Sequence, residues 1–348
     1  MKLPRLSIAA LTVTTLAGLA AFSAGFAAGP RLSWQLTDTH TTARFRGLSP
    51  VSASVAWVAG AAGTVLRTGD GGRHWDSVGP ADASALEFRD IEAFDARRAV
   101  ALTIGEGTDS RVYATSDGGR HWTETFRNDD PNAFYDCMTF LDPRHGLALS
   151  DPVNGKFRVI ATDDGGRHWR IQPTAGMPDA LPGEFAFAAS GTCLVSTQGR
   201  AYFASGGGAT ARIFSSKDRG RTWTVVDSPI PSGASAGIYS LAFADPSHGI
   251  AVGGDYTTPT SAPSGSAYLA GHRWTISRTV PGQYRSGSAW IGRGPGALTV
   301  GPTGSDISWD GGRTWRGFDT GSFDAVLCAH DGACWASGEQ GRVARLRF

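Results

Sequence analysis

The sequence predicts an all-β fold, a seven-bladed β-propeller made of four-stranded antiparallel blades. Three observations point to it: a glycine-rich composition, a tryptophan-containing octapeptide that recurs along the chain, and a lack of helical periodicity beyond the N-terminal segment. The chain has 348 residues, among them 47 glycines and 11 tryptophans, and only 18% of residues are charged. Such a composition favours many short strands joined by tight turns over a helical protein.

The recurring octapeptide combines an aspartate, glycines, a basic residue and a tryptophan. Its copies are TGDGGRHW (68–75), TSDGGRHW (115–122), TDDGGRHW (162–169), SKDRGRTW (216–223) and SWDGGRTW (308–315). A sixth copy, LAGHRW, ends at Trp274 and has lost the aspartate. Successive tryptophans of the six copies are 47, 47, 54, 51 and 41 residues apart. This period is typical of a four-stranded propeller blade.

Each period has the same internal order of strand, turn, strand, loop, strand, octapeptide and strand. For example, the segments MTFLDPRHGLALS and FRVIAT precede TDDGGRHW. The turns contain Asp-Pro, His-Gly or Gly-Gly, as tight connections between strands require. Each period therefore predicts one complete blade.

The two ends of the chain together predict a seventh blade. The last 27 residues, SFDAVLCAHDGACWASGEQGRVARLRF, supply three strands but no further octapeptide. LSWQLTDT (32–39) resembles the fourth strand RTWRGFDT (313–320), so we expect it to complete the last blade. Such closure removes exposed strand edges. The alternative is six blades, with the terminal strands packed elsewhere.

The N-terminus resembles a secretory signal peptide. Lys2 and Arg5 precede an apolar run that extends from about Ser7 to Ala28 and ends in small residues. We therefore expect residues 1–28 to be cleaved, leaving 29–348 as a single propeller domain that is secreted or periplasmic. An uncleaved anchor is the alternative, because the run is just long enough to span a bilayer. The net charge of +1 gives no reason to expect a nucleic-acid partner.

Four cysteines in an exported chain predict disulfides. The segment LCAHDGACW places Cys328 and Cys334 on two short strands joined by a turn, which predicts a bridge between them. Cys137 and Cys193 then pair by elimination. A zinc site is less favoured, because the spacings contain no C-x-x-C pair. We expect no metal and no cofactor.

The octapeptide fits the Asp-box pattern S/T-x-D-x-G-x-T/H-W, and the chain resembles the BNR/Asp-box propeller superfamily, which includes sialidases and the photosystem II stability/assembly-factor type. In this turn the aspartate accepts backbone N–H groups, the glycines adopt positive φ, and the tryptophan packs between sheets. The resemblance implies that the boxes lie on the face away from the ligand site. A structural role is therefore expected for Asp70, Asp117, Asp164, Asp218 and Asp310.

Candidate ligand-binding residues lie where the innermost strands are expected to begin, and in the longer loops of the same face. These strand starts are FRGL (45–48), FRDI (88–91), FYDC (134–137), GEFAF (183–187), IYSL (238–241), YRSG (284–287) and SFDA (322–325). Charged residues are costly to bury unpaired, so they predict a solvated pocket at one mouth of the channel. The candidates are Arg46, Arg89, Asp90, Tyr135, Asp136, Asp151, Lys156, Glu184, Tyr239, Asp255 and Arg285, with Asp324 on the seventh strand start.

Two functions follow from this arrangement. The first, which we favour, is a non-enzymatic, monomeric binding or assembly module whose Arg46, Arg89 and Arg285 hold a carboxylate of a protein terminus or acidic ligand. The second is a sialidase-like glycoside hydrolase, because FRGL stands where sialidases carry an F-R-I-P motif. Its candidate catalytic residues are Asp136, Glu184 and Tyr239. FRGL lacks the proline, and sialidases have six blades rather than seven.

Overall fold

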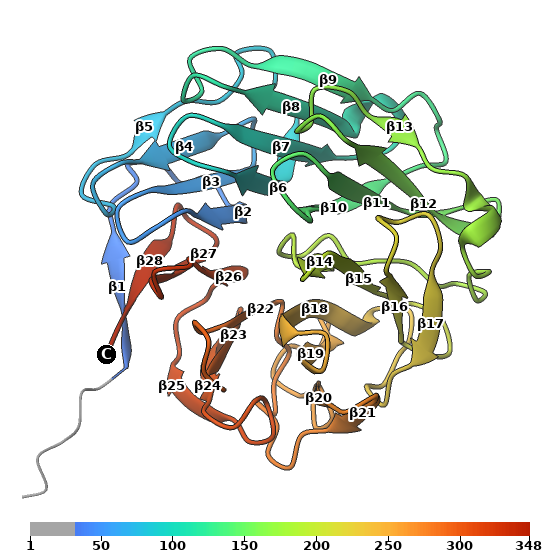
Figure 1. Ribbon diagram of the computed structural model, residues 1–348. Helices are drawn as coiled ribbons and strands as arrows, with labels where there is room; N and C mark the ends of the chain where they lie inside the picture. The colour runs from blue at the N-terminus through green and yellow to red at the C-terminus, as the bar shows by residue number, and fades with distance from the viewer. Residues whose placement is uncertain (1–31) are drawn as a thin grey trace, which may run out of the picture. The chain divides into compact units, whose positions relative to one another are not determined.

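The computed structural model describes residues 32–348, which form seven four-stranded antiparallel sheets around a central axis (Figure 1). Two short 3-10 helices, η1 (Gly107–Asp109) and η2 (Thr174–Gly176), are the helical elements of this range. The predicted all-β, seven-bladed propeller is confirmed. The predicted signal peptide at residues 1–28 lies outside the described residues. Between residues 32 and 348, no helix is long and apolar enough to cross a membrane.

The first six blades each use four consecutive strands, with the innermost strand first. Blades 1 to 3 consist of β2 (Phe45–Pro50), β3 (Ala56–Gly60), β4 (Val65–Thr68), β5 (Asp76–Ser77), β6 (Glu87–Ala93), β7 (Ala99–Ile104), β8 (Arg111–Thr115), β9 (Thr123–Arg127), β10 (Tyr135–Phe140), β11 (Gly146–Val153), β12 (Lys156–Thr162) and β13 (Arg170–Ile171). Blades 4 to 6 consist of β14 (Leu194–Thr197), β15 (Arg200–Ala204), β16 (Arg212–Ser216), β17 (Thr224–Asp227), β18 (Ala236–Asp245), β19 (His248–Asp255), β20 (Ser266–Ala270), β21 (Arg273–Ile276), β22 (Gly287–Trp290), β23 (Ala297–Gly301), β24 (Gly304–Ser308) and β25 (Arg316–Asp319).

Blade 7 closes the ring with strands from both ends of the described chain. Its inner strands are β26 (Ala325–Cys328), β27 (Cys334–Ser337) and β28 (Val343–Arg347), and β1 (Ser33–Thr37) is its outermost strand. Ser33 lies opposite Arg347, and Thr37 lies opposite Val343. Figure 1 shows the blue β1 beside the red β28. The predicted N-terminal closure is confirmed.

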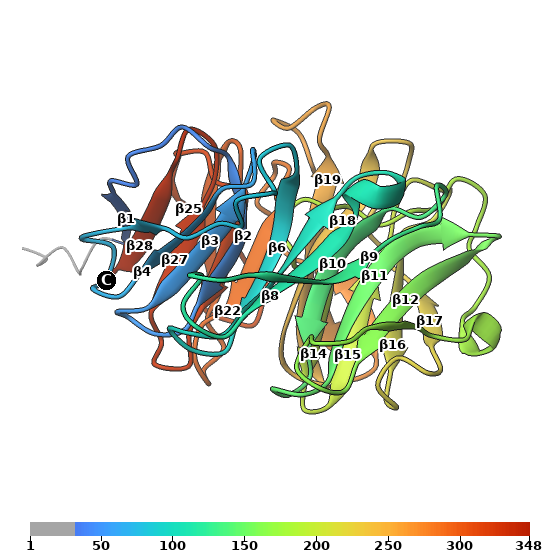
Figure 2. The same ribbon diagram turned by 90° about the horizontal axis from the view of Figure 1, so that it is seen from above.

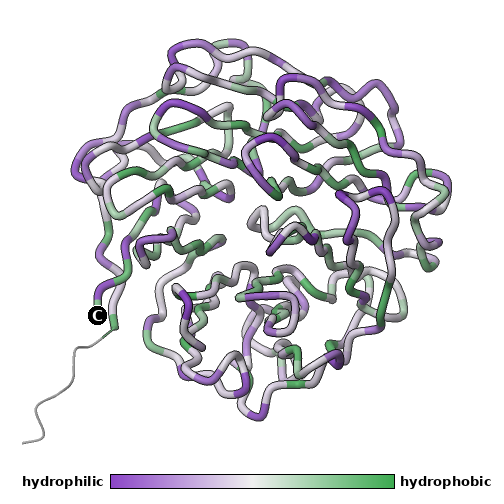
Figure 3. The backbone as a smooth tube through the Cα atoms, viewed as in Figure 1, coloured by the Kyte–Doolittle hydropathy of each residue, from purple (hydrophilic) through white to green (hydrophobic). Residues whose placement is uncertain are grey.

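The hydrophobic core is divided into clusters that lie between neighbouring blades. Trp57 of blade 1, for example, packs in one cluster with Phe88 and Tyr113 of blade 2, and all three are almost fully buried. The edge-on view shows these sheets facing one another (Figure 2), and apolar residues follow the strands while polar ones dominate many loops (Figure 3). Each blade is therefore stabilised by burying apolar area against its neighbours.

The recurring octapeptides form tight turns between the third and fourth strands of their blades. Asp70 Oδ1 accepts the backbone N–H groups of Arg73 and His74, each at 3.0 Å. The N–H donated by His74 is the main reason why the pKa of Asp70 lies below its ordinary value. Gly71 and Gly72 have φ of 79° and 84°, a region that favours glycine. Equivalent aspartate-to-backbone bonds recur at Asp117, Asp164, Asp218 and Asp310.

These five turns define what we call the repeat face. In an antiparallel blade, the connections from first to second strand lie on the same face as those from third to fourth strand. The starts of the inner strands and the connections from second to third strand lie on the opposite face. A ligand site among the predicted residues is thus expected on the opposite face.

Both predicted disulfides are present. Cys137 of β10 is bonded to Cys193, which immediately precedes β14, so this bridge joins the inner parts of blades 3 and 4. Cys328 and Cys334 lie opposite each other in β26 and β27 and are also bonded.

Candidate functional site

The channel mouth on the opposite face is shaped by β-bulges in the inner strands. The pairing register shifts by one residue near the start of four of these strands, and the extra residues are Arg46, Arg89, Asp136 and Tyr239. A bulge bends its strand and changes the direction of the side chain. Arg46 and Asp136 lie close to charged residues of neighbouring blades. Arg89 and Tyr239 contact residues 187 and 188, which belong to a segment described below.

Three arginines gather at this mouth around two carboxylates. Arg44 binds Asp324 through two hydrogen bonds, 2.8 Å from Nε and 2.7 Å from Nη2. Arg89 Nε donates to Glu87 Oε1 at 3.0 Å. Arg46 lies between these pairs, with Nη1 3.7 Å from Glu87 and Nε 3.9 Å from Asp324. These separations are too long for hydrogen bonds, and the buried Nε of Arg46 has no partner.

Arg46 is consequently the least satisfied cation of this cluster. Burial, followed by the positive charge of Arg89, lowers the pKa of Arg46 to about 10. An anion placed against the exposed part of its guanidinium offsets that repulsion. The geometry therefore favours carboxylate or another oxyanion as a ligand of Arg46.

The structure does not bring Arg285 to this cluster, so the predicted convergence of Arg46, Arg89 and Arg285 is wrong for its third member. Arg285 Nε and Nη2 bind Asp306 of β24 at 2.7 and 2.6 Å, and Nη1 donates to Thr303 Oγ1 at 2.9 Å. The residue is 3% exposed. Arg44 takes the predicted place, and the sequence RFR, with arginines on both sides of Phe45, was the available signal.

Two carboxylates, the buried Asp136 and the half-buried Asp151, lie beside the arginines. Asp136 is 1% exposed, and its Oδ2 has no hydrogen-bond partner. Burial, together with the charge of Asp151, holds the pKa of Asp136 well above its ordinary value. Burial raises the pKa of Asp151 to about 7, although the side chain accepts the N–H of Ala186 at 2.8 Å. The pair therefore retains a proton near neutral pH.

A segment that we call the crossing segment, residues 183–193, lies across the channel. The sequence predicted an inner strand at 183–187, but the inner strand of blade 4 is β14, which begins at Leu194. Blades 2 and 3 hold the segment through a hydrogen bond from Arg89 to Ala188 O and the bond to Asp151. Blades 5 and 6 hold it through stacking of Phe187 on Tyr239, at 3.8 Å between ring centroids, and a bond from Ser190 Oγ to Ser286 O at 2.7 Å. The 54-residue interval between Trp169 and Trp223, the longest of the five, was the signal for these extra residues.

Glu184 and Tyr239, the candidate pair for sialidase-like chemistry, have other partners. Glu184 accepts Arg212 Nε at 2.8 Å, Ser205 Oγ at 2.5 Å and the N–H of Leu181 at 2.7 Å. Its side chain is completely buried. The Tyr239 hydroxyl donates to Ser235 O at 2.7 Å, and burial is the main cause of its raised pKa. The bonds of Glu184 hold blade 4 together, and Tyr239 packs against the crossing segment.

Three further candidates are engaged away from the arginine cluster. Tyr135 is fully buried and packs against Phe126, with ring centroids 5.4 Å apart. Lys156 Nζ binds Asp179 at 2.8 Å at the edge of blade 3. Asp255 accepts the N–H and the hydroxyl of Thr257, which fixes its own loop. None of these contacts reaches Arg44, Arg46 or Arg89.

Asp90 lies deeper in the channel than predicted. It lines a cavity of about 520 Å³ near the repeat face, together with Glu92, which sequence reasoning missed. Asp90 Oδ2 accepts the N–H of Met138 at 2.6 Å, yet burial raises the pKa of Asp90 to about 8. Burial, and then the charge of Asp90, raises the pKa of Glu92 well above its ordinary value. Within residues 32–348, no group of three His, Cys, Asp or Glu side chains is arranged to hold a metal ion.

These raised pKa values predict that the propeller is less stable at mildly alkaline pH than at pH 5. A carboxyl group whose pKa is higher in the folded state stabilises the fold below its unfolded pKa, near 4, and loses this effect as pH rises through its folded pKa. For Asp90 and Asp151 that window extends from about 4 to about 8. We expect the free energy of unfolding to fall by about 2 kcal/mol or more between pH 5 and pH 7.5 in urea titrations.

Asp90→Asn, which mimics the protonated carboxyl group, should flatten this pH profile. Asp38→Asn is the matched control, because the Asp38 side chain is 76% exposed. A profile that is unchanged in Asp90→Asn, or equally flattened in Asp38→Asn, would contradict the assignment.

No protein-family model matches this sequence, and no curated protein matches it either. Solved structures do resemble it. YCF48 bound to D1 peptide superimposes with a TM-score of 0.66 at 14% identity, over 90% of this chain and 95% of that one. YCF48 from Cyanidioschyzon merolae gives 0.64 at 13% identity, over 90% and 99% of the two chains.

A GH74 xyloglucanase from Xanthomonas campestris gives a TM-score of 0.62 at 18% identity, over 90% of this chain but 53% of that one. This protein therefore spans about half the length of the xyloglucanase chain. At such identities the likeness establishes a shared propeller fold. Functions are carried by particular sites rather than by the fold.

Proposed function

We propose that this protein is an exported β-propeller that acts as a binding or assembly module, with a carboxylate-bearing partner held at the channel mouth of the opposite face. The observation that carries the proposal is the incompletely paired guanidinium of Arg46, set between Arg44 and Arg89. The structural similarity to YCF48, one of whose structures contains a bound D1 peptide, supports a peptide as the partner.

Arg46 is the residue that we assign to the partner's carboxylate. Arg44 and Arg89 already have carboxylates at hydrogen-bonding distance, so they flank the site rather than bind the partner. The terminal nitrogens of Arg46 make no hydrogen bond to residues 32–348, and the side chain is 19% exposed, so a ligand can bind them from the mouth. A C-terminal carboxylate fits such a guanidinium through paired, charge-assisted hydrogen bonds.

The chain fits the BNR/Asp-box superfamily through its repeated turns, in which the same aspartate-to-backbone bonds recur. We further propose that residues 1–28 are a signal peptide and that 29–348 is the mature, monomeric domain. Two disulfides support a secreted or periplasmic location, because disulfides persist in oxidising compartments.

A peptide array with free C-terminal carboxylates, compared with the same array carrying C-terminal amides, tests this function. We expect binding to the free-carboxylate array and loss of binding to the amides. For a peptide selected from the array, Arg46→Gln should weaken binding roughly thirtyfold, which corresponds to about 2 kcal/mol for a charge-assisted hydrogen bond.

Arg73→Gln, on the repeat face, is the matched control and should bind the selected peptide like the unmodified protein. Equal binding to carboxylate and amide peptides, or no binding to either array, would overturn the proposal. Turnover of a fluorogenic sialoside or aryl glycoside that Arg46→Gln abolishes would instead support the hydrolase alternative.

A further inference from the structure

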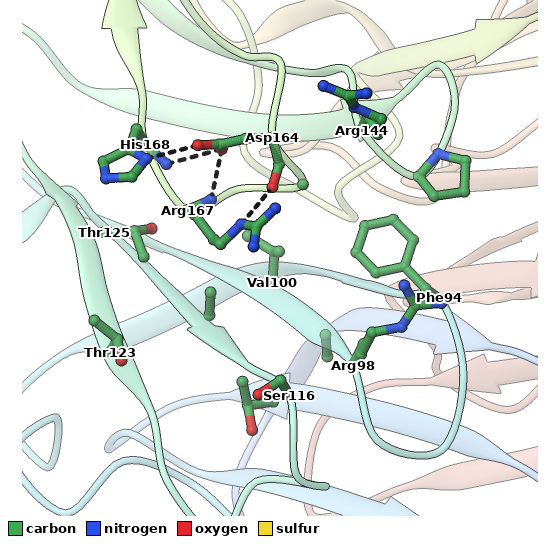
Figure 4. Close-up of a pocket in the computed structure, with 15 residues that line it drawn as sticks. Phe94, Arg98, Val100, Ser116, Thr123, Thr125, Arg144, Asp164, Arg167 and His168 are labelled. Atoms are coloured by element: carbon green, nitrogen blue, oxygen red, sulfur yellow. Dashed lines mark hydrogen bonds and ion pairs between the residues drawn. The ribbon is translucent and has the colours of Figure 1, made fainter.

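A second cavity, of about 850 Å³, lies on the repeat face between blades 2 and 3. Its walls come from β7, β8 and β9 of blade 2 and from two connections of blade 3, namely the turn at 143–144 and the repeated turn at 162–169. Figure 4 shows Thr123 and Thr125 on one side of the cavity and Arg98 on the other, with Arg167 reaching from its turn toward Val100. This volume lies within the range of small-molecule sites.

Three guanidinium groups line the cavity, and two of them have no carboxylate partner. Arg98 Nε binds Asp95 at 2.8 Å. Arg144 and Arg167 use Nε for backbone carbonyls, those of Asp163 at 3.3 Å and Asp164 at 2.9 Å. Among residues 32–348, no acceptor binds the terminal nitrogens of Arg144 or Arg167. The two terminal nitrogens of each of these guanidinium groups are therefore free to bind a ligand.

The one carboxylate that lines the cavity is already occupied. Asp164 accepts the N–H groups of Arg167 and His168, each at 3.0 Å, and its Oδ2 lies 2.6 Å from His168 Nδ1 (Figure 4). Thr162 also donates to it at 2.9 Å. Asp164 therefore fixes its own turn and leaves a net positive charge in the cavity.

The remaining lining residues supply hydroxyl groups and an apolar wall. Ser116, Thr123 and Thr125 offer hydroxyls that both donate and accept hydrogen bonds. The Phe94 ring has the guanidinium of Arg98 5.7 Å from its centroid and is packed edge-to-face with Phe140, so it forms a wall rather than an open stacking surface. The cavity is thus lined by guanidinium groups, by hydroxyl groups and by apolar side chains.

We propose that this cavity binds a sugar-sized organic anion that carries sulfate or phosphate ester groups. The unpaired terminal nitrogens of Arg144 and Arg167 can donate paired hydrogen bonds to two oxygens of a tetrahedral oxyanion. The serine and threonine hydroxyls match the hydroxyls of the carbohydrate frame. This site is distinct from the mouth of the opposite face, and it does not depend on the function proposed there.

Titration calorimetry in 0.15 M salt tests the proposal with sucrose octasulfate for the sulfate source, fructose 1,6-bisphosphate for the phosphate source and sucrose as the uncharged control. We expect one of the anionic probes to bind and sucrose not to bind. Arg144→Gln/Arg167→Gln should weaken that binding by about tenfold or more, because each guanidinium group contributes charge-assisted hydrogen bonds. Thr125→Glu, which places a negative charge in the cavity while both arginines remain, should do the same.

Arg73→Gln is the matched control, because Arg73 Nε makes the same bond to its own turn, 3.1 Å from Asp70 O, without lining the cavity. Arg46→Gln tests independence from the opposite face, and both of these variants should bind the probe normally. The proposal is overturned if neither anionic probe binds, if the arginine pair and Thr125→Glu leave binding unchanged, or if Arg73→Gln weakens binding equally.

Discussion

Glu184→Ala is expected to lower the free energy of unfolding by about 3 to 5 kcal/mol. The substitution leaves Arg212, whose side chain is 8% exposed, without its carboxylate and also removes the acceptor for Ser205 and the Leu181 N–H. A buried charge without a partner is far more costly than a lost surface ion pair. Urea or guanidinium titrations of the purified protein measure this change.

Glu184→Met/Arg212→Met separates the cost of an unpaired charge from the value of the pair. Removing both charges with apolar side chains of similar size should restore most of the stability lost in Glu184→Ala. Asp163→Ala, which breaks an ion pair whose two side chains are each 56% exposed, should change stability by less than about 1 kcal/mol. A Glu184→Ala protein as stable as the unmodified one would contradict the structural role assigned to Glu184.

Removing the Cys137–Cys193 bridge should cost about 4 kcal/mol of stability, and removing Cys328–Cys334 about 2 kcal/mol. The reason is the length of chain that each bridge restrains in the unfolded state, since the bonded residues are 56 positions apart in the first case and 6 in the second. Paired cysteine-to-alanine variants, unfolded in urea, compare the two bridges directly.

The unmodified protein unfolded with and without a reductant serves as the control and should show the sum of both losses. Equal destabilisation by the two double variants would mean that local packing, rather than chain restraint, decides the value of each bridge.

The fold was predictable because its signals are local and repeated. Each octapeptide encodes its own turn through an aspartate at the same position and one to three glycines, so five similar copies predict five blades without long-range information. The degraded copy at Trp274 still marked blade 5, and the likeness of LSWQLTDT to a fourth strand predicted the closure of blade 7.

The site was less predictable because it depends on pairing partners that are distant in sequence. Arg46 is the second residue of inner strand β2, and Arg285 lies two residues before inner strand β22. The ion pair with Asp306, 21 residues after Arg285, holds Arg285 in its own blade. In the same way, the 28-residue separation of Glu184 and Arg212 hides a buried ion pair. The bulges that direct Arg46 and Arg89 leave no mark in the sequence pattern.

The pairing of β1 with β28 also constrains when the protein can fold. Residues 33–37 are synthesised well before their partners at 343–347, and the strands of the other six blades lie between them in the sequence. During translation the ring therefore remains an open arc, with the edge of its final blade unpaired, and contacts of this sequence separation form slowly. The strand pairing that closes the ring is therefore expected to be a late step of folding.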